Sequence, residues 1–152
     1  MGILSWLKGV TTGDTEGTAK FAPGEEYFHG LNMKEAIDAH VAWKARLKTQ
    51  LDGEGDEALE VGVVASDDRC TLGKWLHGEA KQRFAHLPEY AELVRDHSQF
   101  HLSAGNILLE VHQGEKEKAG MMLQGSDFRH ASDRVQLALV RLYAKARDIS
   151  GG

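Results

Sequence analysis

The stretch PEYAELVRDHSQFHLSAGNILLEV, residues 88–111, decides the fold. Pro88 suits the first turn of a helix, where its missing N–H group leaves no hydrogen bond unmade. Behind it, apolar or histidine side chains recur at alternating steps of four and three, which places them on one helix face. They are Tyr90, Val94, His97, His101, Ala104, Leu108 and Val111. The pattern predicts one long helix, ended by Gly114, whose seam is buried in a helix bundle.

Two further long stretches also carry helical spacing. The first begins at Asn32, which with Glu35 resembles a capping box, and ends at Asp52-Gly53. The last covers residues 115–147 and is interrupted at Gly125 and Ser126, where we expect a kink. Both stretches are long enough to pack against the helix over residues 88–114.

A short fourth helix is predicted around Cys70, capped by Asp67 or Asp68 and ended by Gly78. Residues 53–68 before it contain a small apolar island at 61–65, which we expect to be an irregular connection. No stretch shows convincing strand alternation. The predicted fold is therefore all-α: an antiparallel four-helix bundle with a short helix that carries the cysteine.

Composition bounds the class of protein. The chain has 152 residues, of which 41% are hydrophobic and 27% charged, as expected for one globular domain. Its formal net charge of −5 disfavours nucleic-acid binding, which needs a basic face. The single cysteine excludes an internal disulfide, and no apolar run approaches a membrane span.

The first thirty residues are predicted to be an irregular leader that precedes a bundle over residues 31–148. Ile3, Leu4, Trp6 and Leu7 give its start a short amphipathic segment. Such a segment packs on its own protein or a sister subunit, or else serves as a docking peptide or a weak membrane-surface contact. The glycine-rich residues that follow favour irregular structure.

Eight histidines are a high number for this length, and two lie on the predicted seam. His97 and His101 are four residues apart, so their Cα atoms lie about 6 Å apart on one helix face, where both imidazoles can bind one metal ion. This spacing also occurs by chance in proteins. A buried imidazole without a partner costs about 1–3 kcal/mol, so either neighbouring groups or a metal must satisfy this pair.

Two further residues extend the pair to a set of four. His40 lies on the apolar face of the first helix, and Cys70 begins the short helix. A free cysteine is by default a small core side chain. Together, however, His40, Cys70, His97 and His101 are ligand types that zinc prefers, and four protein ligands close a tetrahedral site with no position for substrate. We therefore expect a zinc-binding protein and not an enzyme.

Three blocks of the sequence resemble the chemoreceptor zinc-binding (CZB) domain family. They are AHVAWK at residues 39–44, CTLGKWL at 70–76 and HSQFH at 97–101, in the order typical of that family. GSDF at 125–128 is similar to the family's last helix. The resemblance covers roughly residues 33–142, and the cysteine block is its most specific part.

The resemblance implies a four-helix bundle that forms a homodimer and binds Zn²⁺ through three histidines and one cysteine, here His40, Cys70, His97 and His101. It implies a cytoplasmic sensor of zinc, or of oxidants such as hypochlorous acid that attack the zinc-bound cysteine. Its partner would be a signalling protein of a chemoreceptor or diguanylate cyclase pathway. Nothing in this sequence resembles a receptor coiled coil or a diguanylate cyclase domain, so we expect a stand-alone member.

Several roles around the ligands are also expected. Asp38 and Asp96 are candidates to orient a ligand histidine through its second ring nitrogen. Trp43 and Trp75 are expected to pack in the core near the metal. Gly73 is expected to let the short helix approach a neighbouring backbone.

Three other functions were weighed against the zinc sensor. A hemerythrin-like di-iron bundle needs carboxylates at helical spacing from its histidines, but Lys44 follows His40 and Arg134 follows His130. A zinc hydrolase needs an open coordination position, which four protein ligands would not leave. In a helical adaptor with structural zinc or structural histidines, the site would have no sensing role.

Overall fold

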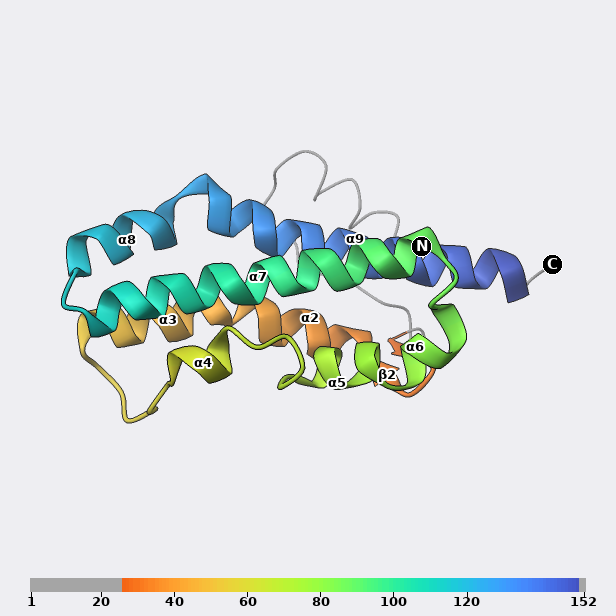
Figure 1. The fold of residues 1–152 in the computed structure, drawn as a ribbon, viewed down its shortest axis with the longest axis horizontal. Helices are drawn as coiled ribbons and strands as arrows, with labels where there is room; N and C mark the ends of the chain where they lie inside the picture. The colour runs from red at the N-terminus through yellow and green to blue at the C-terminus, as the bar shows by residue number, and fades with distance from the viewer. Residues whose placement is uncertain (1–25, 151–152) are drawn as a thin grey trace.

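The computed structural model describes residues 26–150, and in this range it is a bundle of helices. Figure 1 shows the long helix α7 between α9 and the consecutive helices α2 and α3, with the shorter helices alongside. The elements in chain order are β1 (Tyr27–Phe28), β2 (Leu31–Asn32), α2 (Met33–Val41), α3 (Trp43–Asp52), α4 (Val61–Val64), α5 (Thr71–His77), α6 (Glu79–Phe84), α7 (Pro88–His112), α8 (Lys116–Gln124) and α9 (Ser126–Ser150).

Helix α7 confirms the prediction from residues 88–111. It begins at Pro88, packs along α9 and also contacts α3, α4 and α8. Four of the seven predicted seam positions are buried, and the buried face is wider than the seam, since Leu93, Phe100 and Ile107 are buried as well. The core of the protein is therefore built around α7, and the two seam histidines lie inside it.

The other long stretches are helical but interrupted. The Asn32 side chain accepts a hydrogen bond from the Glu35 N–H at 3.0 Å, which confirms the predicted cap. The prediction of one continuous helix from Asn32 to residue 52 was wrong, because the helix breaks at Ala42, between α2 and α3. The break lies two residues after His40. The interruption at residues 125–126 is confirmed, since it separates α8 from α9.

Three short elements were not predicted. Residues 27–32 form a two-stranded antiparallel hairpin, in which Phe28 pairs with Leu31. The apolar island at 61–65, expected to be irregular, contains the one-turn helix α4. Helix α6 follows α5 after Gly78. These elements have only two to six residues, too few to show a clear period.

The expected amphipathic segment at residues 3–7, and most of the expected leader, lie outside the described residues. Within the described part of the chain, no helix combines the length and hydropathy that a membrane span requires.

Candidate metal centre

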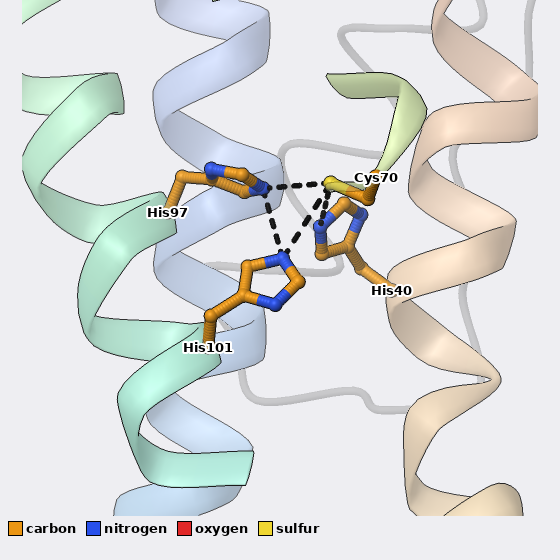
Figure 2. A group of neighbouring side chains, drawn as sticks. All are labelled: His40, Cys70, His97 and His101. Carbon is orange, nitrogen blue, oxygen red and sulfur yellow. Dashed lines mark hydrogen bonds between the residues drawn. The ribbon is translucent and has the colours of Figure 1, made fainter. Parts of the chain in front are cut away.

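Three segments that are far apart in sequence bring the four predicted ligands together. His40 comes from the end of α2, Cys70 from the residue before α5, and His97 and His101 from successive turns of α7. Figure 2 shows the three imidazoles and the sulfur pointing toward one another between these segments. One donor atom from each residue lies within 4.8 Å of all the others.

The separations of these atoms match the edges of a tetrahedron. The Cys70 Sγ lies 3.2 Å from His97 Nε2, 3.5 Å from His101 Nε2 and 3.9 Å from His40 Nε2. The two Nε2 atoms on α7 are 3.1 Å apart. Tetrahedral zinc with ordinary bond lengths requires S···N edges of about 3.6 Å and N···N edges of about 3.3 Å. The four donors therefore surround a space that fits one zinc ion.

Hydrogen bonds at the far side of two rings show that these donors present lone pairs to the centre. The Nδ1 of His40 lies 2.6 Å from the Ala36 carbonyl oxygen, and the Nδ1 of His101 lies 2.9 Å from that of Val64. A carbonyl only accepts, so each Nδ1 carries the proton and each neutral ring keeps a bare lone pair on Nε2. These nitrogen lone pairs and the Cys70 sulfur face one common point. A cation at that point would be stabilised by all of them.

Comparison with protein families matches residues 40–108 to the chemoreceptor zinc-binding domain. The segment that holds all four donors is therefore similar to the CZB domain. Comparisons with curated proteins and with solved structures gave no match. The match begins at His40 and extends past His101, so it includes each predicted ligand. The family name supplies the identity of the metal, and the donor set of this chain fits it.

The hydrogen-bond partners of the candidate ligand histidines differ from those expected. Asp38 forms an ion pair with Lys34, and Asp96 lies 3.6 Å from Arg95, so neither carboxylate is bonded to a ligand ring. Backbone carbonyls of α2 and α4 take that role for His40 and His101. The Nδ1 of His97 is buried and has no partner in the described part of the chain.

Cys70 itself caps α5, in place of the predicted Asp67 or Asp68. Its Sγ accepts a hydrogen bond from the Gly73 N–H at 3.3 Å. Burial raises the pKa of the Cys70 thiol, while the N–H groups of the first turn of α5 lower it in part. A metal ion in the centre would displace the thiol proton and hold the sulfur as thiolate.

The expected close approach at Gly73 is confirmed. A Cβ atom at this position would lie 1.8 Å from the backbone oxygen of Asp67, in the loop that leads to Cys70. Trp75 of the same helix is buried, and its Nε1 donates to the His29 carbonyl at 2.9 Å. Trp43 is buried too, as predicted for both tryptophans.

We predict that Gly73→Ala lowers the free energy of unfolding by about 1–3 kcal/mol, because the loop backbone must move to admit the methyl group. It should also weaken zinc binding, since the same loop positions Cys70. Urea denaturation and zinc titration measure the two effects. Gly62→Ala is the matched control, because its Cβ meets no atom within 4 Å. Equal stability of the two variants would contradict the prediction.

Burial also changes the titration of the ligand histidines. It lowers the pKa of His40 to about 4 and that of His97 to about 2, where the neighbouring histidines add to the effect. The pKa of His101 is lowered by burial as well, and the Val64 carbonyl partly opposes that shift. In the metal-free protein, all three rings are therefore neutral at pH values where unfolded histidines begin to bind protons.

The metal-free protein should consequently lose stability on acidification. An unfolded histidine binds its proton near pH 6.5, whereas burial lowers the pKa of His40 to about 4 and that of His97 to about 2 in the folded protein. As pH falls below about 6.5, the free energy of unfolding therefore drops by about 1.4 kcal/mol per pH unit for each of these two rings. Urea denaturation of chelator-treated protein at successive pH values measures this loss. A free energy of unfolding that stays constant from about pH 6.5 to 4.5 would contradict it.

Proposed function

We propose that this protein is a regulatory zinc-binding protein of bacterial signalling, in which the zinc-bound Cys70 thiolate senses oxidants such as hypochlorous acid. One observation carries the proposal: Cys70 is the most exposed of the four ligand residues. His97, His40 and His101 are only 0–2% exposed, whereas Cys70 is partly exposed. Cys70 also lines a cavity of about 490 Å³ between α3, α4 and α5.

The oxidation step balances without a further reactant. The Cys70 thiolate and hypochlorous acid give a sulfenic acid and chloride; the sulfur loses two electrons and the chlorine gains them. Bound zinc supplies the chemistry that keeps the sulfur ionised, and thiolates are the form of cysteine that oxidants attack. The sulfenic acid is a weaker ligand than the thiolate. The three histidines remain as a partial site.

The start of α5 is the part expected to move when the sulfur is oxidised. The other end of this helix is held firmly, since Trp75 donates to His29 and the Leu76 carbonyl accepts from the Tyr90 hydroxyl at 2.7 Å. Only the Cys70 cap connects its first turn to the histidines. Loss of that connection would free the loop before α5 while the core stays packed.

Hypochlorous acid at one equivalent is expected to release zinc from the wild-type protein and to add one oxygen atom to Cys70. A chromogenic zinc chelator and peptide mass mapping measure the two events. Met121→Leu is the matched control, because Met121 is 70% exposed and offers hypochlorous acid a competing sulfur away from the site. Zinc that stays bound while Cys70 is oxidised, or oxidation confined to methionine, would contradict redox sensing.

If redox sensing were contradicted in this way, the protein would instead sense zinc itself or hold a purely structural zinc ion. The zinc affinity would separate these two roles. A di-iron centre is not favoured, because the metal-binding cluster in the described residues contains no carboxylate. Four protein ligands leave no position for substrate, which supports a role without catalysis.

The homodimer and the signalling partner implied by the resemblance belong to the same proposal. Leu102 and Leu109 support a dimer, since they lie seven residues apart on α7 and are 47% and 39% exposed. Sedimentation of the protein at micromolar concentration tests it, and a single monomeric species would contradict it.

A further inference from the structure

The proposed oxidation leaves a product that this chain cannot resolve. A sulfenic acid condenses with a thiol to form a disulfide, and Cys70 is the only cysteine in the sequence. The thiol must therefore come from another molecule, either a second protein or a small metabolite. The inference below rests on the proposed function, since it concerns the reaction that follows oxidation.

The position of the sulfur favours a small thiol. Cys70 lies at the wall of the cavity of about 490 Å³, together with its co-ligands His40 and His101. The sulfur is turned toward these histidines (Figure 2). A cysteine on a folded partner would have to insert its backbone into this space. A small thiol, no larger than a peptide of a few residues, can enter the cavity completely.

The charges around this cavity define the class of molecule. Arg46, Arg69 and Lys74 line it, against the single carboxylate of Glu60. Arg46 is largely engaged, since it pairs with Glu57 and its guanidinium lies 3.8 Å from the centre of the Trp43 ring. The cavity wall thus carries an excess of positive charge in a chain whose net charge is −5.

Two of these cations belong to residues close to Cys70 in the chain, whereas the charged group that acts most directly on its thiol is the Asp67 carboxylate. Arg69 directly precedes Cys70, and its one ion pair is an exposed 3.9 Å contact with Asp68. Lys74 lies one helical turn beyond Cys70, since its N–H bonds to the Cys70 carbonyl at 2.9 Å. Within residues 26–150, the Lys74 side chain has no ion-pair partner. A carboxylate held by these two side chains would lie in the same cavity that Cys70 lines.

We propose that the cavity binds an anionic low-molecular-weight thiol, whose carboxylate is held by Arg69 and Lys74, and that this thiol resolves oxidised Cys70. The thiol attacks the sulfenic sulfur, a sulfur–sulfur bond forms, and the sulfur–oxygen bond breaks to release water. A second thiol molecule then attacks the mixed disulfide, which returns the Cys70 thiol and releases the small symmetric disulfide. Zinc can bind again after this second step.

The test compares thiols of similar size and different charge. Full-length protein is oxidised with one equivalent of hypochlorous acid and then mixed with mercaptopropionate (anionic), mercaptoethanol (neutral) or cysteamine (cationic). Intact-mass spectrometry follows the mixed disulfide, and each rate is divided by the thiolate concentration. We expect the anion to react about tenfold faster than the neutral thiol, at the low end of electrostatic rate enhancements, and the cation to react slowest.

The double variant Arg69→Glu/Lys74→Glu should remove this preference. The matched control Lys81→Glu/Lys145→Glu makes the same change in net charge at exposed lysines that do not line the cavity, and should keep it. Equal rates for anionic and neutral thiols in the wild type would overturn the proposal. So would a preference that survives in the first double variant, or a disulfide-linked pair of chains as the product.

A second arm separates this proposal from the proposed function. The reduced, zinc-loaded protein is treated with dithionitrobenzoate, which carries two carboxylates, or with neutral dithiodipyridine. The cavity should favour the anionic reagent in the wild type, and this advantage should vanish in Arg69→Glu/Lys74→Glu. Because no sulfenic acid is involved, this arm reports on the anion site even if hypochlorous acid fails to release zinc. Absence of anion preference here would overturn the anion site by itself.

Discussion

Replacing His97 with alanine is expected to abolish stoichiometric zinc binding. His97 Nε2 lies 3.2 Å from the Cys70 sulfur and 3.1 Å from His101 Nε2, so it forms one corner of the donor tetrahedron. Loss of an outer-shell partner already costs zinc sites about 10–100-fold in affinity, and removal of a direct ligand should exceed that. Competition with a chromogenic chelator measures the affinity, and metal analysis measures the zinc content.

His97 is the best ligand to remove because its other nitrogen bonds to nothing in the described residues. His40→Ala or His101→Ala would also remove a hydrogen bond to a backbone carbonyl, which would mix lost stability with lost metal. His112→Ala is the matched control, since His112 is an exposed residue at the end of the same helix. A His97→Ala protein that keeps one tightly bound zinc per chain would refute the assignment of the site.

Removal of zinc is expected to lower the free energy of unfolding of the wild type by about 4 kcal/mol, the stabilisation given by a ligand at 1,000 times its dissociation constant. For a chain of this size, that corresponds to a fall in Tm of about 8–16 °C. A metal ion held by the four donors would join the end of α2, the start of α5 and the middle of α7, whereas without it three neutral imidazoles face a partly buried thiol.

Thermal denaturation with and without a strong chelator measures this effect. His97→Ala should respond little to the chelator, because it has no metal to lose, and His112→Ala should respond like the wild type. If the chelator removes zinc from the wild type and leaves its Tm unchanged, then the metal does not hold these segments together.

The long helices and the grouping of the four candidate ligands could be predicted because their signals repeat or are specific. Helix α7 could be predicted because seven apolar or histidine positions recur at alternating steps of four and three, and because Pro88 marks its start. The ligands have residue types that zinc prefers, and the block around Cys70 is distinctive enough to identify the family. The close backbone approach at Gly73 could be predicted from the same block, because only a residue without a side chain tolerates such a contact.

The details around the ligands could not be predicted, for physical reasons. The acceptors for His40 and His101 are the carbonyls of Ala36 and Val64, and a backbone carbonyl is present at every residue, so it leaves no trace in the sequence. Carboxylates such as Asp38 drew attention instead, although they are engaged at the surface. The cap formed by Cys70 was missed because Asp67 and Asp68 lie shortly before it, and aspartate is the more usual capping residue.

Whether one zinc ion is bound by three imidazoles and one thiolate is tested most directly by X-ray absorption at the zinc edge of the purified protein. The account predicts a first shell of three nitrogen atoms at about 2.0–2.1 Å and one sulfur atom at about 2.3 Å. The sulfur contribution should disappear in Cys70→Ala. A shell without sulfur in the reduced wild type, or one with five or six oxygen and nitrogen atoms, would contradict it.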